Sequence, residues 1–298
     1  MGYHLWTSPV TGYRRTGTRV REIRAMFETG ITVRSIYEPL KACFAKADAR
    51  EMAQLLDHRG FDVAGVKDTH KESITRFVGA DALRKGGIVQ DHAETIVVED
   101  LISDATPLAK MFSILGRREY LFVLVGNRVE GIVTRADLNK PPARIYLFGL
   151  ISLLEMHLLF WIREEFGDDW MRHVKESRLE AARKLFEQRR DKHQELDLCE
   201  CLQICDKADL IISQQPLRQR FGFESKTTGR KTFDRVETLR DLLAHSQARL
   251  TEGSTWGDLV KTIAWLEEAL GKSDTEIEKL ASKKGRDYVE KFWSASDQ

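Results

Sequence analysis

The stretch TLRDLLAHSQ (238–247) brings together an arginine, an aspartate and a histidine that could act on a phosphate ester. If the stretch is helical, at about 100° per residue, Asp241 and His245 point away from the apolar side and Arg240 lies on its flank. The apolar side holds Val236, Leu239, Leu242 and Leu243. Arginine binds phosphate with a planar fork, histidine can take a hydroxyl proton near neutral pH, and an aspartate four residues earlier can fix its tautomer. The alternative interpretation is a solvated helix face.

A basic segment, LRQRFGFESKTTGRKTFDR (217–235), precedes this stretch and could bind a nucleic-acid substrate. Its acidic residues are only Glu224 and Asp234. Phe221 and Phe223 could stack on bases, as aromatic side chains do in proteins that bind single strands. A flexible, solvated loop would explain the same composition. The candidate RNA contacts are Arg218, Arg220, Arg230 and Lys231, beside Lys226 and Arg235.

Composition limits the class of protein. The 298 residues suffice for two domains. Lys and Arg number 47 against 46 Asp and Glu, so no overall positive field favours nonspecific nucleic-acid binding. The cysteines are too few for a disulfide framework and indicate a reducing compartment, the cytoplasm. Three of the four cluster without a second Cys or His group, so we expect helical packing there and no metal site: Cys43, Cys199, Cys201 and Cys205.

One segment, IYLFGLISLLEMHLLFWI (145–162), is long enough to span a bilayer. Glu155 and His157 lie in its middle, where an ionisable side chain costs about 2.5–3.5 kcal/mol to insert. We therefore expect a buried helix and no membrane, with these two residues in hydrogen bonds between helices. The first residues lack the apolar stretch of a secretory signal, although HLWTSP (4–9) could add a strand to a sheet.

Short helices and β-rich runs alternate in the first half of the chain and recur after about 55 residues, which indicates a duplication about a pseudo-twofold axis. The first copy is predicted as helix 49–60, strands 61–66 and 74–78, and short helix 79–87. The second copy is predicted as helix 106–118, strands 119–125 and 128–134 around a Gly-Asn turn, and helix 135–140.

Helical periodicity replaces this alternation from Arg144 onward. Pro141 and Pro142 mark the junction, and Ser273 with Glu276 forms a capping-box pattern that predicts the start of the last helix. The fold class is therefore α+β, with small mixed sheets and helices followed by a C-terminal all-α bundle. The predicted division is an N-terminal extension over 1–25, the duplicated unit over 26–143 and the bundle over 144–298.

The stretch VEGIVTRADL (129–138) resembles the signature of cystathionine-β-synthase (CBS) domains, small modules that work as tandem pairs. In that family a Gly-x-x-Thr-x-x-Asp element binds adenine nucleotides in a cleft between the copies. The resemblance assigns the ribose hydroxyls to Asp137 and the phosphate to Thr134, with Arg135 adding charge.

The first copy, RFVGADAL (76–83), matches this signature less well. Asp81 occupies the aspartate position, but Val78 replaces the threonine and cannot hydrogen-bond a phosphate. We expect a regulatory adenine nucleotide, similar to AMP, ADP or ATP, mainly in the second copy. The alternative is a scaffold without nucleotide, in which Thr134 is a plain helix N-cap.

The stretch RDLLAH (240–245), in a helical bundle, resembles the motif of the HEPN (higher eukaryotes and prokaryotes nucleotide-binding) superfamily. Many members are metal-independent ribonucleases or RNA-binding proteins. The resemblance implies that Arg240, Asp241 and His245 cleave RNA through its 2′-hydroxyl, with no cofactor for catalysis. Family members pair two copies face to face to supply a second imidazole, so we expect an isologous homodimer.

Two functions fit these expectations. In the first, an adenine-nucleotide-sensing CBS pair regulates a metal-independent endoribonuclease. In the second, the chain is a non-catalytic nucleotide-binding dimer, regulatory or RNA-binding, that signals to a partner. Incubation of RNA with the protein in EDTA distinguishes these two functions.

Overall fold

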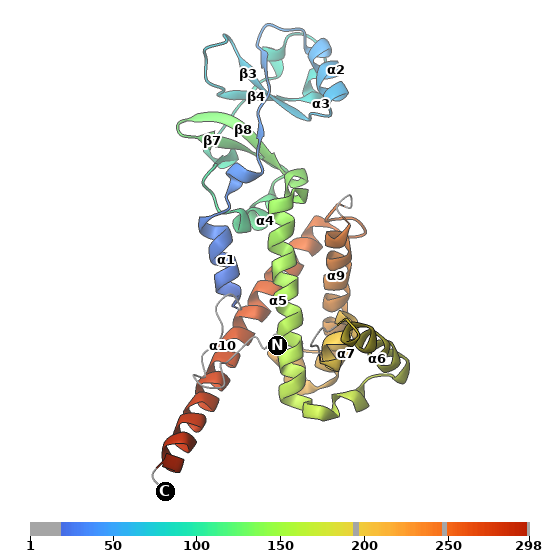
Figure 1. The fold of residues 1–298 in the computed structure, drawn as a ribbon. Helices are drawn as coiled ribbons and strands as arrows, with labels where there is room; N and C mark the ends of the chain where they lie inside the picture. Colours follow the sequence, from blue (N-terminus) through green and yellow to red (C-terminus); the bar gives the residue numbers. More distant parts are fainter. Residues whose placement is uncertain (1–18, 193–196, 246–248, 297–298) are drawn as a thin grey trace. The chain divides into compact units, whose positions relative to one another are not determined.

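The computed structural model describes residues 19–192, 197–245 and 249–296, with side chains as far as residue 280. The chain divides into two compact units (Figure 1). The α/β unit comprises Phe27–Ala143, and the helical unit comprises the described residues from Arg144 onward together with residues 19–26. Most of the expected N-terminal extension, including HLWTSP, lies outside the described residues, and its last residues belong to helix α1 (Val20–Thr29).

Two four-stranded sheets of the same plan form the α/β unit. The strand orders are β1-β8-β7-β6 and β2-β3-β4-β5. β6 with β7 and β2 with β3 are parallel pairs, and the other neighbours are antiparallel. The first sheet contains β1 (Glu38–Pro39), β6 (Leu101–Ser103), β7 (Tyr120–Val125) and β8 (Arg128–Thr134). The second contains β2 (Ala42–Phe44), β3 (Val63–Lys67), β4 (Arg76–Gly79) and β5 (Glu94–Thr95).

Each sheet takes its short edge strand from the segment that precedes the other copy. Glu38 of β1 pairs with Ile132 of β8, whereas β5, which precedes the second copy, pairs with β4 of the first. The backbone hydrogen bonds beside this exchange are repeated: Val33 N to Thr106 O at 2.9 Å, and Val89 N to Ala47 O at 3.0 Å. The structure thus confirms the duplication, and the exchange joins the two copies into one unit.

Short helices complete each copy. The first has α2 (Ala49–Arg59) and α3 (Ala80–Leu83), and the second has α4 (Leu108–Arg117) and the 3-10 helix η4 (Arg135–Asn139). The α/β unit also contains the 3-10 turns η1 (Val33–Ser35), η2 (Val89–His92) and η3 (Val98–Asp100), each of which precedes a strand. α2 begins where the Asp48 carboxylate accepts from Glu51 N at 3.0 Å, and it ends at Gly60, whose φ is 67°. The helix predicted over 135–140 is a 3-10 turn over Arg135–Asn139, with the capping box of Thr134 and Asp137 at its start.

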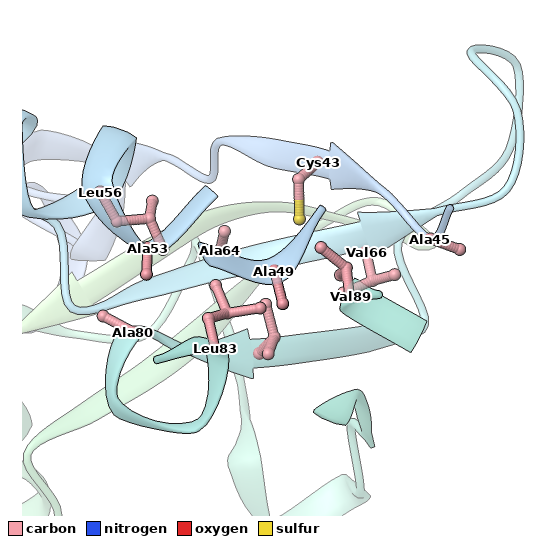
Figure 2. Packing of buried hydrophobic residues seen from close by; sticks show 11 residues of the cluster. Cys43, Ala45, Ala49, Ala53, Leu56, Ala64, Val66, Ala80, Leu83 and Val89 are labelled. Atoms are coloured by element: carbon pink, nitrogen blue, oxygen red, sulfur yellow. The ribbon is translucent and has the colours of Figure 1, made fainter. Parts of the chain in front are cut away.

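Small side chains dominate the core of the first copy, as Figure 2 shows. The buried cluster consists of Cys43, Ala45, Ala49, Ala53, Leu56, Ala64, Val66, Val78, Ala80, Leu83 and Val89. Alanine is the commonest residue type in it, so α2 and α3 can pack close to the sheet. Protein interiors are close-packed, and enlarging such a side chain forces the backbone to shift.

The helical unit is built around the long apolar helix α5. The two prolines lie at the junction, since the units divide between Ala143 and Arg144. They also begin α5, where the N–H that proline lacks is not needed. The segment Pro141–His173 is long and apolar enough to cross a membrane, but 61% of its most apolar window is buried inside the protein. Besides α1, the helical unit contains α5 (Pro141–Phe166), η5 (Gly167–His173), α6 (Glu176–Arg190), η6 (Leu198–Cys201), α7 (Ile204–Ser213), α8 (Gln215–Arg220), α9 (Lys226–Ala244) and α10 (Trp256–Ser296).

A buried hydroxyl joins α5 to α10. The prediction that a helix starts at Ser273 is wrong, because this residue lies inside the continuous helix α10 and is fully buried. Its Oγ lies 2.7 Å from His157 Nδ1 and accepts from Trp161 Nε1 at 2.7 Å. His157 Nε2 lies 3.4 Å from Asp274 Oδ1. His157 therefore forms hydrogen bonds between helices, as expected for it.

Replacing Ser273 by alanine is expected to destabilise the helical unit. The change leaves two buried ring nitrogens, on His157 and Trp161, without their shared partner, and each such loss costs about 1–3 kcal/mol. Urea denaturation followed by tryptophan fluorescence measures the change in free energy of unfolding. Ser177→Ala, on the exposed face of α6, is the matched control and should change it by less than about 0.5 kcal/mol. Equal stability of the two variants would contradict the assignment.

Candidate functional site

The Thr134–Asp137 turn at the end of β8 is a closed capping box. Asp137 Oδ2 accepts from Thr134 N at 2.7 Å and from Thr134 Oγ1 at 2.9 Å. Thr134 Oγ1 in turn accepts from Ala136 N at 3.2 Å. Asp137 is only 7% exposed. The structure therefore brings together the two residues to which the resemblance assigned phosphate and ribose.

Lys140 engages the other oxygen of Asp137. Its Nζ lies 2.8 Å from Asp137 Oδ1 and also contacts the Ile36 carbonyl and the Glu38 carboxylate. Burial lowers the pKa of Lys140, but the hydrogen bonds to Asp137 and Glu38 raise it, and the net change is upward. The ammonium therefore stays charged at neutral pH. Nothing in the sequence pattern had singled out this lysine.

Arg135 is held by the end of α4. Its Nε donates to the Leu115 carbonyl at 2.8 Å, and its Nη1 lies 3.8 Å from Glu119 Oε1. The guanidinium thus has protein partners of its own beside the turn.

The equivalent turn of the first copy has a different arrangement. Val78 is fully buried in the core of that copy, and the Asp81 side chain is 93% exposed. Asp81 pairs with Arg84, which also lies 2.8 Å from Asp57 Oδ1. Only the second copy therefore combines a hydroxyl with a nearly buried carboxylate.

Three aromatic rings from the two sheets lie together beside this turn. Phe77 of β4 and Phe122 of β7 have ring centroids 5.0 Å apart, and Tyr120 of β7 lies 5.6 Å from Phe122. Tyr120 is the cross-strand partner of Thr134, so the two side chains share a face of the sheet. Phe77 and Tyr120 are partly exposed. Burial, followed by nearby carboxylates, raises the pKa of Tyr120, so its hydroxyl stays protonated at neutral pH.

The candidate catalytic stretch lies at the C-terminal end of α9. Val236 and Leu239 are buried, whereas His245 is exposed, as the helical wheel predicts. However, α9 ends at Ala244, and His245 is its C-cap, with φ −102° and ψ 101°. The Arg144 guanidinium donates to the His245 carbonyl at 2.9 Å. The backbone at this histidine is therefore anchored to α5.

Asp241 pairs with Arg240 and not with the imidazole. Arg240 Nη2 lies 2.9 Å and Nε 3.2 Å from Asp241 Oδ1. The expected contact between Asp241 and His245 requires both residues to be helical, but the chain leaves the helix at His245. Burial lowers the pKa of Arg240, but the hydrogen bond to Asp241 and the charge of Glu155 raise it. The net pKa lies above the ordinary value for arginine. Arg240 is thus a cation held beside its own counterion.

A charged cluster next to Arg240 was not foreseen from the sequence. Lys207 of α7 is only 3% exposed, and its Nζ lies 3.5 Å from Glu155 Oε2 of α5. Glu155 therefore contacts a neighbouring helix, in line with the structural role expected for it. The signal in the sequence was a lysine directly before the run ADLII (208–212), which periodicity alone could not connect to Glu155.

The basic segment is largely folded into α8 and α9. Phe221 and Phe223 are buried, and Phe223 stacks on Trp265 with ring centroids 5.2 Å apart, so neither ring is free for bases. Arg218 Nη1 donates to the Ile212 carbonyl, Arg220 pairs with Glu276 over the Trp161 ring, and Arg230 pairs with Asp209. Lys231 is exposed on α9. Of the four candidate RNA contacts, three have intramolecular partners.

The cysteines of η6 and α7 are protonated at neutral pH. Burial raises the pKa of Cys199 to about 12 and also raises those of Cys201 and Cys205. Zinc binds thiolates, which such burial disfavours. Among the residues that the structure describes, no group of three or more His, Cys, Asp or Glu side chains is placed to hold a metal ion.

Comparisons with known proteins give structural similarity only. No protein-family model and no curated protein sequence matches this chain. CBSX2 from Arabidopsis thaliana, a CBS-pair protein, is 18% identical, with a TM-score of 0.33, over 38% of this chain and 95% of its own. The structure of CBSX2 with AMP gives 18% identity and a TM-score of 0.33 over 38% and 97% of the two chains. The CBS domain of a bacterial CNNM/CorC family Mg²⁺ transporter, solved with ATP, is 15% identical, with a TM-score of 0.33, over 42% of this chain and 94% of its own.

Gly131, the glycine of the Gly-x-x-Thr-x-x-Asp element, is expected to be intolerant of a side chain. A Cβ there would collide with the Tyr37 ring and lie 3.1 Å from the Glu38 carbonyl. Gly131→Ala should lower the free energy of unfolding by about 1–3 kcal/mol, the usual cost of overpacking. Gly79→Ala is the control, because its Cβ would meet nothing closer than 3.9 Å. Denaturant titration of both variants measures their free energies of unfolding. Equal midpoints for Gly131→Ala and Gly79→Ala would contradict the predicted intolerance at Gly131.

Proposed function

We propose that the α/β unit is a tandem CBS pair that binds an adenine nucleotide at its second copy and thereby regulates the helical unit. The observation that carries this proposal is the pairing of Thr134 with the nearly buried Asp137, which the first copy lacks. The exchange of edge strands between two copies of one plan supports the paired architecture.

The turn offers suitable chemistry for each part of such a ligand. A carboxylate accepts hydrogen bonds from ribose hydroxyls, which suits Asp137. The Thr134 hydroxyl, which donates to Asp137 Oδ2 without ligand, would turn its proton to a phosphate oxygen. Tyr120, opposite Thr134 on the neighbouring strand, offers a ring for the base. If the ligand favours one state of the helical unit, coupling of about 1–3 kcal/mol is the usual scale.

Asp137→Ala is expected to abolish binding of AMP, ADP and ATP, because the ribose hydroxyls lose their acceptor. Asp81→Ala is the matched control: it removes the equivalent carboxylate, which is 93% exposed and stands beside Val78. Isothermal titration calorimetry of both variants gives the affinities. Equal losses in the two would contradict the asymmetry, and circular dichroism checks that Asp137→Ala is folded.

A second function is favoured by the exposed end of α9. We propose that Arg240 and His245 cleave single-stranded RNA without metal, in a homodimer that places two such ends face to face. The imidazole would take the proton of a 2′-hydroxyl, whose oxygen attacks the phosphorus and leaves a 2′,3′-cyclic phosphate. Arg240 would stabilise the negative charge on the phosphorus oxygens. The protonated imidazole (imidazolium) of a second copy would give its proton to the departing 5′-oxygen.

His245→Ala should lower RNA cleavage in EDTA by about 10²–10⁴, the usual effect of losing a positioned general base. Arg240→Ala should show a similar loss, and Asp241→Asn a smaller one. The side chains of Arg240 and His245 lie outside the buried stripe of α9, so the stability of these two alanine variants should stay close to that of the parent protein. His58→Ala, on the exposed face of α2, is the control. If the parent protein leaves RNA uncut while nucleotide still binds, the helical unit is a non-catalytic partner of the sensor.

A further inference from the structure

The carboxylate of Asp137 is nearly saturated within the protein. A carboxylate offers about four acceptor positions, two on each oxygen. Oδ2 accepts from Thr134 N and Thr134 Oγ1, and Oδ1 accepts from Lys140 Nζ. The two vicinal hydroxyls of a ribose need two acceptor positions on the same carboxylate. One of the existing donors must therefore leave before the diol can bind.

Lys140 is the donor that can leave. Thr134 N belongs to the backbone of the turn, and a ligand without phosphate offers nothing to draw the Thr134 hydroxyl away from Asp137 Oδ2. The Lys140 side chain, by contrast, is flexible and 31% exposed. Its ammonium also has other acceptors in place, the Ile36 carbonyl and the Glu38 carboxylate, which is 61% exposed. The charge would therefore stay solvated and paired after it leaves Asp137.

We infer that Lys140 is a built-in competitor for the ribose at Asp137. This inference rests on the proposed nucleotide site. Lys140 immediately precedes Pro141, the first residue of α5. Its backbone N–H caps η4 through the Asp137 carbonyl at 3.1 Å. The residue that yields to the ligand is thus also the connection between the turn and the central helix.

Lys140→Met is the variant that tests this, because methionine keeps the apolar stem and removes the ammonium. The probe is adenosine, which has the diol but no phosphate, so loss of a nearby cation does not weaken its binding. Hydrogen bonds to charged groups imply about 10- to 100-fold tighter binding to the variant than to the parent protein. 2′,3′-Dideoxyadenosine, which lacks the diol, should bind both proteins equally. Lys110→Met, exposed on α4, is the matched control.

A second measurement follows Lys140 itself. Acetylation by a water-soluble reagent, read by mass spectrometry, should be slower at Lys140 than at Lys110 in the parent protein. Asp137→Ala, or saturating adenosine, should accelerate it. Acetylation rates unchanged by Asp137→Ala would overturn the competition.

The two proposals fail in distinguishable ways. If adenosine binds the parent protein and Lys140→Met with equal affinity, the competition is overturned and the nucleotide site stands. If neither protein binds adenosine or any adenine nucleotide, the nucleotide site is overturned and the inference falls with it. Tighter binding of adenosine to Lys140→Met, without a change for the dideoxy compound, supports both.

Discussion

The exchange of β1 and β5 between the two copies is the constraint on which the α/β unit depends. A sheet edge exposes a row of unpaired backbone groups, and each copy alone would end in such an edge beside its hairpin. β1 covers this edge of the second copy and β5 that of the first. The close approach of β1 also explains the glycine of the Gly-x-x-Thr-x-x-Asp element, since the Tyr37 ring lies against Gly131. The same crossing delivers Ile36 and Glu38 to Lys140.

The elements that sequence patterns predicted well are those that specify themselves locally. β8 occupies the predicted residues, because alternating apolar residues and a Gly-Asn turn define a hairpin without outside help. β1 and β5 were missed because each has only two residues and exists through its partner. Ser273 illustrates the opposite error: its local capping pattern was present, but two buried side chains of another helix use its hydroxyl.

The residues of the candidate sites show the same limit. The periodicity of α9 correctly places His245 away from the buried side, but it cannot reveal that the helix ends one residue earlier. A cluster of arginines looks alike whether it binds a phosphate or, as for Arg220 and Arg230, internal carboxylates. The match between Thr134 and Asp137 was visible because the two are neighbours in sequence. Lys140 is as near to Asp137 in sequence, but no pattern marked it, and its contacts with Ile36 and Glu38 form only in the folded chain. Tyr120 reaches Thr134 only through strand pairing.

Strand exchange also sets the order in which the unit can be completed during synthesis. Glu38 and Pro39 leave the ribosome before every other described strand, but their partners, Ile132 and Gly131, belong to the last. Contacts so distant in sequence close slowly, and chains are made from the N-terminus. Until β8 emerges, β1 is an unpaired edge on a nascent chain. On a polysome, that is the stage at which neighbouring nascent chains could exchange β1 and assemble as domain-swapped oligomers.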